Sequence, residues 1–210
     1  MAEDRELLDT LEKVLERLYA GYNLYGAIIY LAFGVATALF VLVAMTPWFQ
    51  SLSGRGSTIA SIVYWGLAII IVGYVSKHYG KSYISRLEAR LGRRAERGRR
   101  CGLLSAAAWA SFPATMMAAW LVASMLGRGG AYASAFSVLF ALGVGNLGNA
   151  LMEKCYGGEL VNPPMIAALL LFLGSPLALL SGWGYAAMLI ILAYTLAALG
   201  YVYNALKKIA

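Results

Sequence analysis

Long apolar stretches, each close to twenty residues, dominate the pattern of this chain from residue 24 to residue 206. Six such stretches occur, and none of them contains Asp, Glu, Lys, Arg or His. They cover residues 24–45, 58–76, 104–126, 131–152, 164–181 and 184–206. A helix needs roughly 20 apolar residues to cross the hydrocarbon of a bilayer. Each stretch is therefore predicted to be a transmembrane helix.

An all-α fold follows from this pattern. In lipid, only helices and closed barrels satisfy every backbone group, and the stretches lack the alternation of barrel strands. The first twenty residues also lack the basic start and cleavage site of a secretory signal. The prediction is a polytopic α-helical integral membrane protein of the cell membrane, multi-pass, with six transmembrane helices. It divides into a cytosolic amphipathic helix at residues 1–22 and a membrane domain at residues 23–210.

Composition agrees with a membrane protein, and the position of the charge predicts its orientation. Only 13% of the residues are charged, against about 25% in soluble domains. Residues 77–100 hold nine Lys or Arg and two Glu, a net charge of +7, which equals that of the whole chain. Cytoplasmic loops are enriched in Lys and Arg. The loop at 77–103 is therefore predicted to be cytoplasmic, and six spans then put both termini in the cytoplasm.

The basic loop also contains an amphipathic pattern. Ile84, Leu87 and Leu91 follow the spacing of one helix face,. The arginines that lie largely away from this face are Arg86, Arg90, Arg93, Arg94 and Arg97. A basic surface helix suits anionic lipid head groups or an acidic protein partner, although fixing the orientation needs no partner. Nucleic acid is disfavoured, because no aromatic residue interleaves the arginines and no nucleic-acid-binding motif occurs.

The N-terminal segment is acidic and has a helical seam of its own. Residues 1–20 hold six Asp or Glu against three Lys or Arg. Its apolar positions are Leu8, Leu11, Leu15, Leu18, Tyr22 and Tyr25. Their three-four spacing is typical of a coiled coil. The helix is expected to pack on the membrane domain, to pair with its own copy in a homo-oligomer, or to lie against the basic loop.

Polar and helix-breaking residues inside the spans are the candidates for a functional site. They are Gly145, Asn146 and Asn149 in the fourth stretch, Pro113 in the third, and Ser175 and Pro176 in the fifth. Small residues let helices approach closely, and proline kinks a helix. A pair of interrupted helices marks the binding site in some transporters. The six residues therefore either line a transport path or serve helix packing.

The two cysteines are hypothesised to form a disulfide. Cys101 precedes the third stretch and Cys155 follows the fourth, and a short turn joins these stretches, so that their far ends can meet. Both ends are predicted to be cytoplasmic, where disulfides are rare outside hyperthermophiles. A single Gln and a preference for Arg over Lys suit a thermophile,.

Groups that carry enzyme chemistry are missing from the sequence. It has no HExxH, no phosphate-binding loop and no dinucleotide fingerprint,, and no base accompanies a candidate nucleophile. The expectation is a protein that is not an enzyme, that holds no metal or cofactor, and that contacts membrane lipids. Two functions remain open. One is a membrane transport component: a channel, a facilitator or the membrane subunit of a permease. The other is a non-transporting scaffold that recruits partners through its acidic N-terminal helix and Arg-rich loop.

Overall fold

The structure of the chain is a computed structural model. It describes residues 2–44, 46–52, 95–128, 130–155 and 161–207, with individual positions between 56 and 74. All regular structure in these residues is α-helical, as predicted. The helices are α1 (Ala2–Ala44), α2 (Pro47–Gln50), α5 (Ala95–Ala110), α6 (Phe112–Met125), α7 (Gly130–Cys155) and α8 (Pro163–Lys207).

Several of these helices are able to span a membrane. Within the described residues, Ala20–Ala44 of α1, all of α7 and all of α8 are long and apolar enough. Cys101–Ala110 of α5 and the whole of α6 add a fourth span if they are taken together, with a bend of 46° between them. The bend lies beside Pro113, the second residue of α6, because proline interrupts the hydrogen bonds of a continuous helix,. The chain is thus a helical membrane protein.

Two predicted elements lie mainly or wholly outside the described residues. Of the second stretch, 58–76, only individual positions are described, and the basic helix around residues 84–91 is not described at all. The end of the basic loop is described as the first part of α5, which begins at Ala95.

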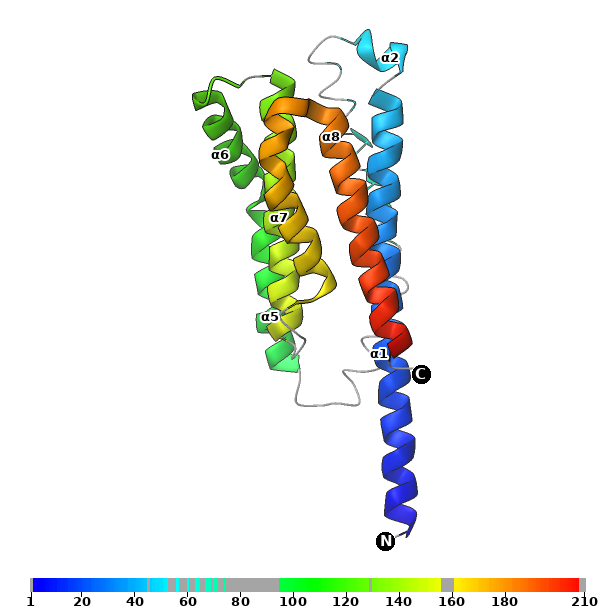
Figure 1. Cartoon of the computed structure of the whole chain (residues 1–210). Coiled ribbons are helices and arrows are strands. Elements are labelled where there is room, and N and C mark those ends of the chain that lie inside the picture. The colour runs from blue at the N-terminus through cyan, green and yellow to red at the C-terminus, as the bar shows by residue number, and fades with distance from the viewer. Residues whose placement is uncertain are drawn as a thin grey trace.

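The long helix α8 contains both the fifth and the sixth predicted stretches. Gly182 lies between them and has φ 70° and ψ −153°, so the helix breaks there. This conformation is essentially confined to glycine, because a Cβ would clash with the backbone. The two arms of α8 lie side by side and run in opposite directions (Figure 1).

Small residues place α7 at the centre of the bundle. α7 packs against α5, α6 and α8, and α8 also packs against α1. A Cβ on Gly145 would lie 2.9 Å from the ring of Trp109, and a Cβ on Gly143 would lie 2.8 Å from the ring of Phe172. These glycines therefore allow large side chains of the neighbouring helices to contact the α7 backbone.

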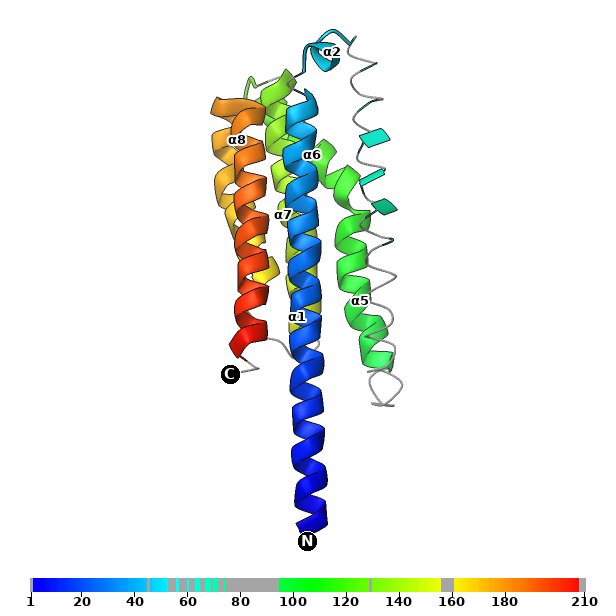
Figure 2. The ribbon, with the colours of Figure 1, turned by 90° about the vertical axis from the view of Figure 1, so that its right-hand side faces the viewer.

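The N-terminal part of α1 extends beyond the bundle. Figure 2 shows α1 continuing past the end of the molecule at which the C-terminus lies. Thr10 and Val14 are exposed, and Ala20 is buried. α1 runs without a break across residue 22, where the sequence pattern divides the N-terminal helix from the membrane domain.

Candidate functional site

A cluster of buried tyrosines lies where α1 meets α8. Tyr30 comes from α1, and Tyr194 and Tyr201 come from one face of α8. The ring of Tyr30 lies 5.5 Å from each of the other two rings, measured between centroids. All three side chains are buried. A buried tyrosine hydroxyl needs a hydrogen-bond partner, and α7 supplies partners to two of them.

Asn146 is the first of these partners. The hydroxyl of Tyr30 donates a hydrogen bond of 2.8 Å to Oδ1 of Asn146, and Nδ2 of Asn146 donates to the carbonyl of Leu142. Only 1% of Asn146 is exposed. The amide thus joins α7 to α1 and has both of its polar atoms paired.

Glu153 is the second partner. The hydroxyl of Tyr201 donates a hydrogen bond to Oε1 of Glu153 in the last turn of α7. The fourth predicted stretch ends at residue 152, but α7 continues to Cys155 and brings this carboxyl group into the helix. An ionisable residue inside a membrane helix is a functional candidate by default.

Asn149 has partners on a different helix. Its Oδ1 accepts hydrogen bonds from Oγ of Ser105 at 2.6 Å and from Nε1 of Trp109 at 3.1 Å, both on α5. Asn146 and Asn149 therefore form hydrogen bonds with different helices, α1 and α5. Among the described residues, every buried side-chain nitrogen or oxygen has a hydrogen-bond partner.

The two cysteines form a disulfide in the structure. Cys101 of α5 and Cys155 at the end of α7 have their Cα atoms 5.6 Å apart, and Cys101 is completely buried. This is the pair hypothesised from the sequence. With Asn149, it makes a second connection between α5 and α7.

The prolines of the predicted path are not brought together. Pro113 lies in the first turn of α6 and Pro176 lies in the first arm of α8, and both are exposed on the bundle of described helices. Ser175 is buried, and its hydroxyl donates to the carbonyl of Phe172 within its own helix. Gly145, as described above, contacts Trp109.

The candidate arginines fall outside what the structure describes. Arg86, Arg90, Arg93 and Arg94 precede α5, and Arg97 lies in α5 with a side chain that is not described. In the described part of the chain, no group of three His, Cys, Asp or Glu residues is placed to hold a metal ion.

The sequence interpretation missed Tyr30, Tyr194, Tyr201 and Glu153. A signal was present, because Tyr194 and Tyr201 stand seven residues apart in a stretch without charged residues and so share a helix face,. No protein-family model, curated protein or solved structure matches the chain.

Proposed function

We propose that this protein is a membrane assembly subunit, a scaffold that recruits a partner through the N-terminal part of α1. In this proposal the chain crosses the cell membrane six times, and its termini and basic loop are cytoplasmic. The observation that carries the proposal is the continuation of α1 beyond the bundle as one unbroken helix (Figure 1).

A projecting helix of this kind needs a second surface. In proteins, most helical stability comes from packing an apolar face against another surface. The leucines at residues 8, 11, 15 and 18 follow coiled-coil spacing,. A second copy of the chain supplies a matching seam, and a basic protein segment would complement the acidic residues around it.

The interior of the bundle supports the same function. Asn146 and Asn149 are each occupied in joining α7 to a neighbouring helix. Such hydrogen bonds hold transmembrane helices together, which suits a rigid platform.

Substitution of the seam tests the proposal. Leu11→Glu and Leu15→Glu together put charge on the seam, and the expected result is loss of oligomers or co-purified partners in mild detergent. Val14→Glu is the matched control, because Val14 is exposed and lies off the seam. Light scattering coupled to size exclusion measures the mass of the complex. A wild-type protein that is a partner-free monomer would overturn the proposal.

Charge reversal tests the contribution of the Arg-rich loop. Replacing Arg93, Arg94 and Arg97 by glutamate should release a partner whose acidic residues bind this loop, because like charges then face each other. Lys207→Glu, at an exposed basic residue near the C-terminus, is the control. Equal partner retention in both variants would restrict recruitment to the N-terminal helix.

A transport component is the second candidate, and Glu153 is the observation that favours it. A carboxyl group beside buried tyrosines in a membrane helix is the type of residue that lines ion and proton pathways. Proteoliposomes loaded with a pH-sensitive dye measure proton flux. Under this candidate, Glu153→Gln lowers the flux and Lys154→Gln, at its exposed neighbour, does not. Unchanged flux in Glu153→Gln, or none above protein-free liposomes, would exclude a proton path at Glu153.

A further inference from the structure

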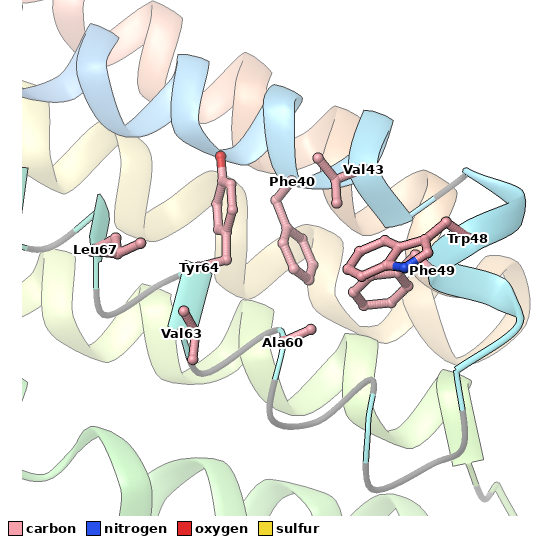
Figure 3. A pocket seen from close by; sticks show the side chains of 8 residues that line it. All are labelled: Phe40, Val43, Trp48, Phe49, Ala60, Val63, Tyr64 and Leu67. Atoms are coloured by element: carbon pink, nitrogen blue, oxygen red, sulfur yellow. The ribbon is translucent and has the colours of Figure 1, made fainter.

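A pocket of about 350 Å³ lies at the C-terminal end of α1, opposite to the projecting N-terminal part. Its walls come from the last turns of α1, from α2 and from four described residues of the following segment, Ala60, Val63, Tyr64 and Leu67 (Figure 3). It is separate from the tyrosine cluster, which lies nearer the middle of α1. The pocket is within the size range of ligand sites in proteins, about 300–1,000 Å³.

Aromatic side chains hold the walls of the pocket in place. The ring of Phe40 lies 5.2 Å from the ring of Tyr64 and 6.2 Å from the ring of Phe49, measured between centroids. Figure 3 shows Phe40 between Tyr64 on one side and Phe49 on the other. Contacts of this kind favour edge-to-face or offset arrangements, so the wall is a packed row of rings.

Local hydrogen bonds orient α2 at one end of the pocket. The hydroxyl of Thr46 caps the helix by accepting from the backbone N–H of Phe49, and Pro47 occupies the first turn. The hydroxyl of Ser51 donates to the carbonyl of Trp48 at 2.7 Å. Together these bonds direct Phe49 into the wall and leave 63% of Trp48 exposed. Tryptophan is enriched where a membrane meets water.

The lining of the pocket is almost entirely carbon. Its one hydroxyl belongs to Tyr64, which donates a 2.6 Å hydrogen bond to the carbonyl of Ala36 on α1. A polar ligand would therefore lose its hydrogen bonds to water and gain few in return. An apolar ligand that fills the pocket makes van der Waals contacts with the lining, and these contacts are lost when the pocket is empty.

We propose that this pocket binds one hydrocarbon chain of a membrane lipid, with the polar head group of the lipid beside Trp48. The occupant is identified by where the walls lie. Phe40 and Val43 belong to the final turns of the candidate span Ala20–Ala44, where the surrounding solvent is hydrocarbon. Trp48 stands beyond the end of that span, at the depth of the head groups. A lipid chain enters from the bilayer without crossing water.

Photo-crosslinking tests the proposal directly. The full chain is reconstituted in phosphatidylcholine that contains a small fraction of lipid with a diazirine on one acyl chain, and the labelled peptides are mapped. The expected result is several-fold stronger labelling at Val63 and Leu67 than at Met188 and Leu192, which are comparably exposed apolar residues of α8. Equal labelling of the two regions would mean ordinary bilayer contact and would overturn the proposal.

Filling the pocket provides a matched comparison. Ala60→Phe adds a ring to the lining, and Ala118→Phe adds the same ring at an exposed position of α6. The labelling at Leu67 should fall to the level of the α8 residues in Ala60→Phe and stay high in Ala118→Phe. If Ala60→Phe does not fold, Val63→Phe provides the same test from an exposed position of the lining. Absence of lipid adducts at both Val63 and Leu67 of the wild-type protein would also overturn the proposal.

Discussion

The hydroxyl of Tyr30 and the amide of Asn146 lie 2.8 Å apart although the residues are separated by 116 positions in the chain. The hydrogen bond joins α1, the helix that projects from the bundle, to α7 at its centre. Any force on the N-terminal part of α1 therefore reaches the bundle through this contact and through the packing of α1 on α8.

Tyr30→Phe removes this connection and should lower the free energy of unfolding. The substitution leaves Oδ1 of Asn146 buried without its donor, and hydrogen bonds between membrane helices contribute about 0.6 kcal/mol on average and up to about 1.7. We expect a loss of about 1 kcal/mol, measured by equilibrium unfolding in mixed micelles. Tyr203→Phe is the control, since Tyr203 is 65% exposed. Equal effects of the two substitutions would contradict the assignment.

Loss of the disulfide should also destabilise the protein. The bond closes a separation of 54 residues, for which the chain-entropy treatment gives about 4 kcal/mol in water. A membrane-bound unfolded state retains its helices, so we expect about half of that value for Cys101→Ser with Cys155→Ser. Thermal unfolding with and without reductant measures the change, and reductant should affect only the wild type. Two free thiols in non-reduced wild-type protein, found by mass spectrometry, would contradict the bond.

Gly148→Ala should disturb the contact between α7 and α5. The new Cβ would overlap the Cβ of Ala108 and lie 3.3 Å from the carbonyl oxygen of Leu104, and overpacking of this kind costs about 1–3 kcal/mol. Gly102→Ala is the matched control, because nothing lies within 4 Å of a Cβ at Gly102. The control should be neutral or slightly stabilising, by up to about 1 kcal/mol, through helix propensity. Thermal unfolding of both variants checks the prediction, which is wrong if Gly148→Ala is the more stable.

Gly182→Ala should destabilise the junction of the two arms of α8. The positive φ of 70° with ψ of −153° costs a residue with a Cβ about 1–3 kcal/mol. Gly184→Ala tests the same substitution two residues away, where a Cβ meets nothing within 4 Å. Protease sensitivity at the junction and the melting temperature measure the difference. If Gly182→Ala has the melting temperature of the wild type, residue 182 does not need the backbone conformation that favours glycine, and the prediction is wrong.

Much of the fold was predictable because it depends on single segments. The break between residues 181 and 184 appears in the sequence as a Gly-Trp-Gly interruption and in the structure as the turn at Gly182. The bend at Pro113 was foreseeable for a similar reason, since proline interrupts a helix wherever it occurs,.

The candidate site was predictable only in part. The amides Asn146 and Asn149 stand out because polar residues are rare in membrane helices, but their helical spacing does not reveal which neighbour each one faces. Glu153 was overlooked because it lies one residue beyond an apolar stretch, and its position inside the helix depends on the continuation of α7 to Cys155. Tyr30 is not distinguished from the apolar residues of its span in the sequence, because the partner of its hydroxyl lies on a distant helix.

The sequence by itself determined that this is a helical membrane protein, because length, apolar character and absence of charge are properties of each stretch alone. It also marked the small residues of α7 as places of close approach. Only the tertiary structure decided that Tyr30 meets Asn146, that Tyr201 meets Glu153, and that Ser105 and Trp109 meet Asn149. The residues of each pair lie at least 40 positions apart in the chain. Small residues permit many arrangements of neighbouring helices, so the sequence does not specify the pairs. The partners are selected by the packing of whole helices against one another.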